Sequence, residues 1–183
     1  MHIKTSCLKN ILMASAIITS VLLFFSFFTI SIPIFESFLE SSSFSVSFFS
    51  LPSFVEKNAL GLITRLCGKG TSVAVLILCA VLKYVCLLSS CLGIYGIWEM
   101  CRKNKNTRFV FASSVMALAM CVLSFLVLII VNVFILRYAG TLTEIMNLET
   151  TLELNFSPTI WLYLATCSSS VSLIVLYKWQ KSE

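Results

Sequence analysis

The sequence predicts an all-α membrane protein, a bundle of four transmembrane helices with a small outer cap formed by two outer loops. The chain has 183 residues, of which 58% are hydrophobic and 11% charged, and its mean hydropathy is +0.98. A helix needs roughly 20 predominantly apolar residues to cross the hydrocarbon core. Four stretches meet this requirement, at about residues 11–32, 73–97, 109–136 and 158–177. The remaining segments are too short to bury a core of their own, so residues 1–183 form a single membrane domain.

The distribution of Lys and Arg predicts the orientation of these helices. Basic residues gather on the cytoplasmic side of membrane proteins. With alternating helices, one side carries both chain ends and the basic turn at residues 98–108, where Arg102, Lys103, Lys105 and Arg108 lie. The other side carries loops 33–72 and 137–157, which hold most of the glutamates. We therefore expect a multi-pass protein, in the plasma membrane, with cytoplasmic N- and C-termini.

The first apolar stretch has an alternative interpretation as a cleaved signal peptide. Lys4 and Lys9 would form its basic region. However, the apolar run exceeds the usual length of about 7–15 residues, and no A-x-A-like cleavage site follows it. A retained helix is the favoured interpretation.

The first outer loop contains two patterns. In residues 43–48, Phe and Val alternate with Ser, which is typical of a half-buried strand, although a low-complexity segment lying on the membrane would look the same. Farther on, Ser53 and Glu56 have capping-box spacing, and apolar residues recur at helical spacing from Val55 to Leu66. Gly68 follows as a possible helix-ending residue. We expect a short amphipathic helix directly before the second membrane helix.

The second outer loop repeats this arrangement. Thr141 and Glu144 form another possible capping box before a set of leucines. Ser157 and Pro158 then predict the N-cap and first position of the last helix.

The layout resembles that of claudin-like tetraspan proteins, the group that includes the peripheral myelin proteins. The similarity lies in the long first outer loop with a possible strand, the pre-helix segment, the short basic turn at 98–108, the overlong third helix and the shorter second outer loop. It covers the whole chain as architecture. The tryptophan-rich loop motif of that group is absent, because the tryptophans are Trp98, Trp161 and Trp179 and the first outer loop holds one cysteine, Cys67.

The residue types argue against an enzyme. The single histidine is His2, the chain has no aspartate, and no glutamate falls in the middle of a predicted helix. General acid–base and metal-assisted mechanisms need such groups. The eight cysteines include no C-x-x-C pair. We expect no catalytic site, no metal site and no cofactor, and the net charge of +5 follows from the topology without a nucleic-acid partner.

Lys83 is the candidate binding residue. It lies in the second predicted helix, where an ammonium group costs roughly 2.5–3.5 kcal/mol on insertion scales. Cys79, Cys86 and Ser90 share its helical face, and Asn132 on the third helix is a further polar candidate. Several interpretations remain open: Lys83 reaches along the helix to the interface, is neutral, pairs with a carboxylate of a partner's helix, or lines an aqueous or anionic-lipid site.

Stripes of small residues indicate where the helices touch. They comprise Ser89 and Gly93 on the second helix, Ser113, Ala117 and Cys121 on the third, and Ala165, Ser169 and Ser172 on the fourth. Such stripes allow close helix approach in membranes. They predict packing within the bundle, with contacts between copies as the alternative.

Two functional hypotheses follow. The first is a non-enzymatic accessory or organising subunit, embedded in the lipid bilayer, that binds another membrane protein through the second helix or the outer loops. The alternative is a small channel or transporter component in which Lys83 lines an anion-attracting path.

The orientation makes a testable prediction. In intact cells, a membrane-impermeant thiol reagent should label Cys67 from outside and Cys101 only after permeabilisation. The reverse pattern of labelling would contradict the predicted orientation.

Overall fold

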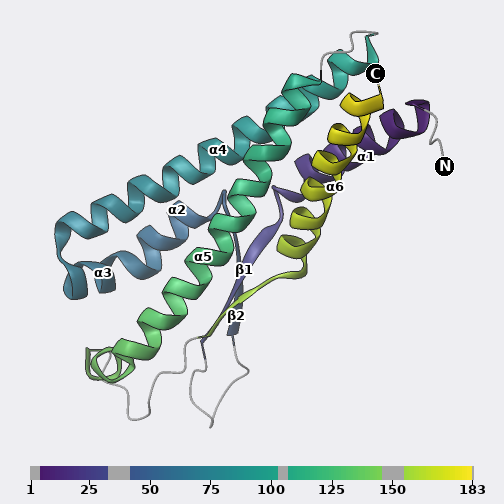
Figure 1. Ribbon diagram of the computed structural model, residues 1–183. Coiled ribbons are helices and arrows are strands. Elements are labelled where there is room, and N and C mark those ends of the chain that lie inside the picture. Colours follow the sequence, from purple (N-terminus) through teal and green to yellow (C-terminus); the bar gives the residue numbers. More distant parts are fainter. Residues whose placement is uncertain (1–4, 33–41, 103–106, 146–154, 183) are drawn as a thin grey trace.

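The computed structural model describes residues 5–32, 42–102, 107–145 and 155–182 and is mostly helical. Four helices pack together: α1 (Thr5–Leu22), α4 (Lys69–Cys101), α5 (Arg108–Ile145) and α6 (Ile160–Ser182). Helix α1 lies between α4 and α6, and α5 contacts both α4 and α6. The start of α1 and the end of α6 lie at the same end of the bundle, as Figure 1 shows.

Within the described residues, three helices are long and apolar enough to cross a membrane. These are α4, α5 over Arg108–Val133, and α6 over Ile160–Lys181, whereas α1 contributes a shorter apolar stretch, Cys7–Leu22. Each of the three extends beyond the range predicted from hydropathy at one end or both. Helix α5 continues to Ile145, so the segment predicted to begin a loop at residue 137 is still helical.

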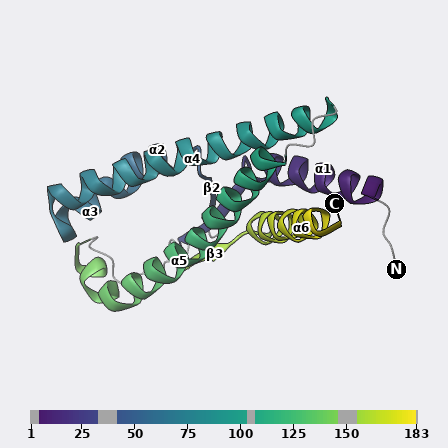
Figure 2. The ribbon, with the colours of Figure 1, turned by 45° about the horizontal axis from the view of Figure 1, so that its top comes forward.

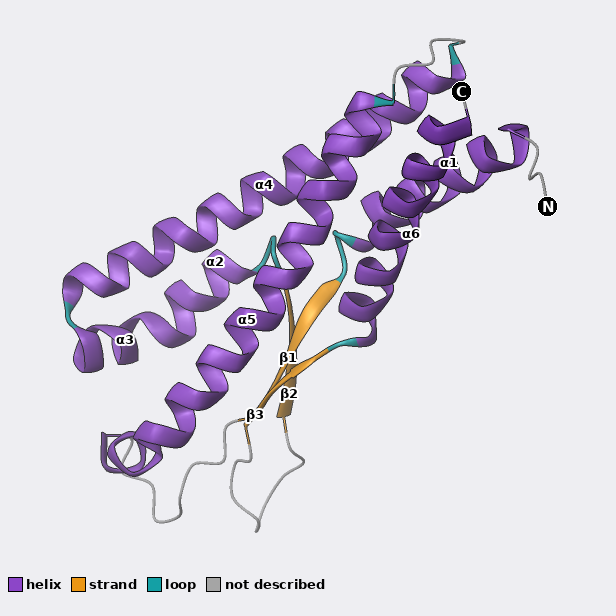
Figure 3. Cartoon of the chain, viewed as in Figure 1, coloured by secondary structure: helices purple, strands orange, loops and turns teal. Residues whose placement is uncertain are grey.

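The predicted first helix, residues 11–32, is wrong in its second half. Helix α1 ends at Leu22, and residues Ser26–Ile32 form strand β1. The sheet in the described chain has the order β2-β1-β3, with β2 at Ser42–Ser47 and β3 at Asn155–Pro158. Both neighbours pair antiparallel with β1, and Thr29 lies opposite Ser45 on one side and Ser157 on the other. Figure 3 shows this sheet continuing from the end of α1.

This sheet settles the two interpretations of residues 43–48 in favour of the strand. It also changes the start of the last helix, because Pro158 ends β3 and α6 begins at Ile160. Ser157 is therefore a strand residue and the predicted N-cap is wrong. The two segments expected to be loops, 33–72 and 137–157, contribute strands β2 and β3 on either side of β1. Residues 33–41 and 146–154 lie outside the described part of the chain.

The predicted helix before α4 is confirmed. It comprises α2 (Leu51–Phe54), a π-helical turn η1 (Val55–Ala59) and α3 (Leu60–Cys67), and it packs along α4. The helix begins at Leu51 with no side-chain cap from Ser50, so the capping box at Ser53 was wrong. The possible capping box at Thr141 does not start a helix either, because α5 runs through it.

Two hydrophobic clusters hold the described elements together. One lies at the end of the bundle where α1 begins, and it includes Leu12, Met100 and Val110. The other lies where the helices meet the sheet, and there Phe27 and Phe48 contact each other edge to face at 5.1 Å between ring centroids. Because the second cluster contains residues of α1, β1, β2, α4, α5 and α6, it fixes the sheet to the helices.

Gly68 makes the connection between α3 and α4 possible. Its backbone has φ 88° and ψ 165°, a region that only glycine enters readily, and α4 begins at the next residue. The space around it is open, so an added methyl group would strain the backbone without meeting other atoms.

We predict that Gly68→Ala lowers the free energy of unfolding by about 1–3 kcal/mol through backbone strain. Gly70→Ala is the matched control, because Gly70 also has open space around it but is helical, where alanine is favoured. Thermal unfolding in detergent, followed by circular dichroism, measures both. Equal melting temperatures for the two variants would contradict this account of the connection.

Candidate functional site

The five predicted site residues do not form one site. Cys79, Cys86 and Ser90 are buried, while Lys83 and Asn132 are half-buried. Ser89 of α4 contacts Ser113 of α5, and the two helices run antiparallel. Counting from this contact at 1.5 Å per residue places Asn132 roughly 20 Å from Lys83 along the helix axis. Asn132 is therefore not part of the surroundings of Lys83.

Cys86 and Ser90 face α1 instead of a partner. The Cys86 thiol donates a hydrogen bond to the Leu23 carbonyl at 3.3 Å, and the Ser90 hydroxyl donates to the Ser20 carbonyl at 3.3 Å. Cys79 is also covered, with 6% of its surface exposed. The structure therefore uses this face of α4 for contacts within the chain, and these three side chains are not available to a partner.

The spacing of buried residues on α4 explains why Lys83 is less buried than Cys79 and Cys86. The buried stripe of α4 includes Cys79, Leu82, Cys86, Ser89, Gly93, Gly96 and Met100, at alternating intervals of three and four residues. This spacing is that of a helix packing seam. Lys83 follows Leu82 and so lies at the edge of the seam, next to Tyr84, which is 67% exposed.

The level of Lys83 along the bundle is set by the contact between Cys86 and Leu23. Because Leu23 directly follows the last residue of α1, Cys86 lies level with the end of that helix. Lys83 lies nearly one turn farther along α4, toward Lys69. The lysine is therefore beyond the end of α1, at the level where the chain turns into β1.

The helix contacts are made by small and hydroxyl-bearing residues. Ser89 and Ser113 donate to each other's carbonyl groups, at 3.1 and 2.7 Å. A methyl group on Gly93 would meet the hydroxyls of Ser20 and Ser113, so α1, α4 and α5 approach closely at this glycine. All residues of the predicted small-residue stripes are buried within the chain, which confirms packing inside the bundle.

The polar contacts between α1 and α6 were missed by the sequence analysis. The Thr19 hydroxyl donates to Ser168 at 2.9 Å, and the Ser172 hydroxyl donates to Ser15 at 2.8 Å. On each helix the two residues are four apart, so the signal was present as hydroxyl residues repeated on one face. These side chains satisfy one another and hold α1 against α6.

The described residues were searched for side-chain groups that could hold a metal ion. They contain no group of three or more His, Cys, Asp or Glu side chains that could hold a metal ion. Comparisons of the chain with models of protein families, with curated proteins and with solved structures find no match. The described chain is mostly helical, and its apolar helices are compatible with an integral membrane protein. The resemblance to claudin-like proteins stays a prediction.

The contact at Gly93 makes a testable prediction. Gly93→Ala should lower the free energy of unfolding by roughly 1–3 kcal/mol, because the added methyl overpacks the junction of three helices. Gly61→Ala, in α3, adds the same methyl where no atom lies within 4 Å, and it should not destabilise the protein. Unfolding in detergent measures both variants, and a Gly93→Ala protein as stable as Gly61→Ala would contradict close packing here.

Proposed function

We propose that the chain is an integral membrane protein in which α1, α4, α5 and α6 each cross the bilayer, and that it is an accessory or organising subunit for another membrane protein. The observation that carries this proposal is a row of exposed apolar side chains on α4 beyond the end of α1. The row comprises Val73, Ile77, Leu78, Val81 and Tyr84, which are 49–67% exposed. We refer to it as the outer apolar face.

The lengths of the helices support a boundary of the hydrocarbon core at the end of α1. Helix α1 has 18 residues, so it is about 27 Å long, close to the roughly 30 Å of the core. Helices α4 and α5 have 33 and 38 residues, or about 50 and 57 Å, so both must extend well past the core. On α6, Trp161 is 37% exposed and stacks on Phe25 just beyond the end of α1, and tryptophan is enriched at membrane interfaces.

The sheet supports the same boundary. Strands β2 and β3 are the edges of the described sheet, and an open edge presents backbone N–H and C=O groups that lipid cannot satisfy. Lowering the chain into the bilayer until the outer apolar face is immersed would bring this sheet into the hydrocarbon. We therefore propose that one layer lies outside the hydrocarbon core. It comprises the sheet, α2, α3 and the outer parts of α4 and α5 (Figure 1).

In this arrangement the outer apolar face lies outside the hydrocarbon core and would face water, which is unfavourable. A partner protein that covers this face would remove that cost. Large contiguous apolar patches on water-exposed surfaces mark interaction sites. The described outer part of α5 is also apolar, with Ile129, Ile130, Val133 and Leu136 exposed. Figure 2 shows α4 and α5 close together near α1 and separate farther out, so each can present its own face. We propose that the partner packs on the outer apolar face of α4.

Lys83 has a defined place in this proposal. It lies at the membrane side of the outer apolar face, near the boundary of the core, where a long side chain reaches the headgroup region at little cost. A carboxylate of the partner beside this boundary would pair with it. Exposed Arg102, Arg108 and Lys178 gather at the opposite end of the bundle, which supports a cytoplasmic location for that end. The alternative of a channel lined by Lys83 has no specific observation in its favour.

We predict that Ile77→Ser reduces co-purification of the partner by about tenfold or more, because burying an isoleucine contributes about 1.5–3 kcal/mol. Ile174→Ser on α6 is the matched control, since the two isoleucines are 59% and 56% exposed. The measurement is affinity purification in mild detergent, with quantitative mass spectrometry of stoichiometric membrane proteins. Equal recovery with both variants would contradict the proposal.

A companion pair of variants tests Lys83. Lys83→Leu should lower recovery of the same partner while leaving the protein inserted, and Lys83→Arg should retain part of it because the charge persists. If Lys83→Leu recovers the partner at the wild-type level, Lys83 is not part of the partner site. The Ile77→Ser variant then tests the outer apolar face alone.

A further inference from the structure

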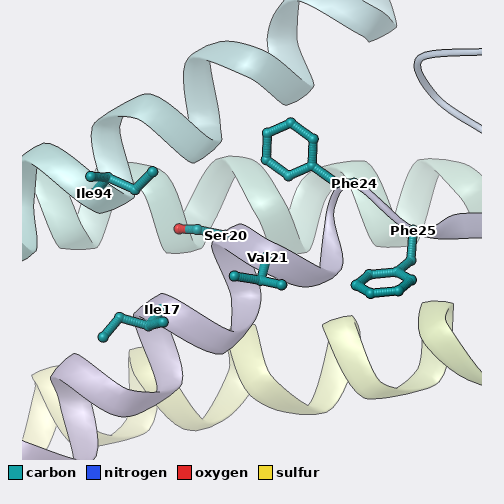
Figure 4. A pocket seen from close by; sticks show the side chains of 6 residues that line it. All are labelled: Ile17, Ser20, Val21, Phe24, Phe25 and Ile94. Carbon is teal, nitrogen blue, oxygen red and sulfur yellow. The ribbon is translucent and has the colours of Figure 1, made fainter.

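The groove between α1 and α4 has an apolar lining. Its lining residues are Ile17, Ser20, Val21, Phe24, Phe25 and Ile94. Figure 4 shows the apolar side chains around Ser20, whose hydroxyl is buried against Gly93. An apolar wall alone does not select a ligand, because polar groups provide orientation and specificity. Charged groups and exposed aromatic rings meet instead at the end of the bundle where α4 ends and α5 begins.

A continuous row of ring contacts joins α4 to α5 at this end. The Tyr95 ring meets the Phe109 ring edge to face, with 5.0 Å between centroids, and it lies 5.7 Å from the Trp98 ring. The guanidinium of Arg102 lies over the Trp98 ring, with Cζ 5.2 Å from the ring centroid. Tyr95, Trp98 and Arg102 are exposed. We refer to these four residues as the aromatic–arginine face.

The packing of α4 against α5 holds this face together. A methyl group on Gly96 would come within 3.1 Å of the Phe109 side chain, so the two helices approach closely there. Tyr95, Trp98 and Arg102 follow one another at intervals of three and four residues, which places them on one side of α4. The close approach at Gly96 therefore keeps Phe109 beside that side of the helix.

Stacking on Trp98 prepares Arg102 to bind an anion. The guanidinium is planar, and its contact with the ring occupies its flat face, whereas its N–H donors point outward in the plane. Because the stacked group is already restricted, it loses less conformational entropy when it binds a ligand. Phosphate is an anion whose oxygens match this fork of donors, since they can accept two parallel hydrogen bonds.

The charge at this end of the bundle also favours an anion. Residues 98–108 contain four basic residues and one acid, Glu99, so their net charge is +3. Arg108 is exposed and directly precedes Phe109, which places its charge at the α5 end of the aromatic–arginine face. An anion bound to Arg102 is therefore also attracted by Arg108.

The depth of the aromatic–arginine face agrees with the headgroup region. At 1.5 Å per residue, Arg102 lies about 24 Å from the level of Cys86, which marks the outer boundary under the proposed function. A hydrocarbon core of roughly 30 Å places the opposite boundary close to Arg102. Tryptophan and tyrosine are enriched at such boundaries, and Trp98 and Tyr95 are exposed beside it.

We propose that the aromatic–arginine face binds the headgroup phosphate of an anionic phospholipid in the cytoplasmic leaflet. Arg102 donates two hydrogen bonds to the phosphate oxygens, and Arg108 adds to the attraction. The rings of Trp98 and Tyr95 lie against the glycerol and the upper part of the acyl chains. The net positive charge selects an anionic headgroup over a zwitterionic one. The proposal rests on the membrane location and orientation given under the proposed function.

The test measures lipid binding to the full-length protein in mild detergent by native mass spectrometry. The probes are dioleoylphosphatidylglycerol and dioleoylphosphatidylcholine, which share their acyl chains and differ in headgroup charge. The first molecule of phosphatidylglycerol should bind at least about fivefold more tightly than phosphatidylcholine. Arg102→Gln should lower the affinity for phosphatidylglycerol about tenfold, because it removes charged hydrogen bonds, without changing the melting temperature.

Lys178→Gln is the matched control for Arg102→Gln. Lys178 is exposed at the same end of the bundle, since its neighbour Trp179 belongs to the cluster that contains Met100 and Val110. The change removes one positive charge outside the aromatic–arginine face and should alter the affinity by less than about twofold.

The stacking contact has its own pair of variants. Trp98→Leu should weaken phosphatidylglycerol binding about threefold, because the guanidinium loses its ring, and Trp98→Phe should retain most of the affinity.

Two results would overturn the proposal in favour of diffuse surface charge. These are equal affinities for the two lipids, and equal losses with Arg102→Gln and Lys178→Gln. Displacement of phosphatidylglycerol by inorganic phosphate at constant ionic strength would assign the site to a soluble phosphate compound instead. None of these readouts depends on recovery of a protein partner, and thiol labelling reads the orientation separately. Failure of this proposal is therefore distinguishable from failure of the proposed function.

Discussion

The structure depends on how the backbone leaves α1. A helix end carries carbonyl groups without helical partners, and in apolar surroundings each must find a donor. Here the Cys86 thiol donates to the Leu23 carbonyl, and the chain then enters β1, where β2 and β3 satisfy the backbone on both sides. The carbonyl groups of Val21, Leu22 and Leu23 therefore all accept hydrogen bonds where the helical layer ends. Lys83 and the outer apolar face both lie beyond this point along α4.

The two layers are held together by different physical means. Between the helices, close approach at Gly93 and hydroxyl contacts such as those of Ser89 with Ser113 add to an apolar cluster that includes Leu12 and Met100. Packing and hydrogen bonding of this kind suit helices in lipid, where burial of apolar groups gains little. At the junction with the sheet, Phe27, Phe48 and Val46 form an ordinary apolar core.

The sequence predicted the parts of the fold that depend on local patterns. Hydropathy located α4, α5 and α6, period-two alternation indicated β2, and the helical pattern before Gly68 indicated α2 and α3. Strand β1 was missed because its phenylalanine and isoleucine residues continue the apolar run of α1, and hydropathy does not distinguish a strand from a helix there. Its pairing with β3 joins residues far apart in sequence, which no local pattern reveals. The sequence also could not show that Lys83 is less buried than Cys79 and Cys86, because a spacing of three or four residues does not separate the centre of a helix seam from its edge.

The depth of two residues on α4 tests the proposed boundary most directly. Ile77 and Ile94 are 59% and 61% exposed and lie on opposite sides of the level of Cys86. In a protein whose five exposed cysteines are replaced by serine, a spin label is placed at either position, and its collisions with oxygen and with a polar nickel complex are compared in liposomes. The account predicts that the label at 77 collides mainly with the nickel complex and the label at 94 mainly with oxygen. Oxygen-dominated collisions at both positions would place the outer apolar face in lipid and contradict it.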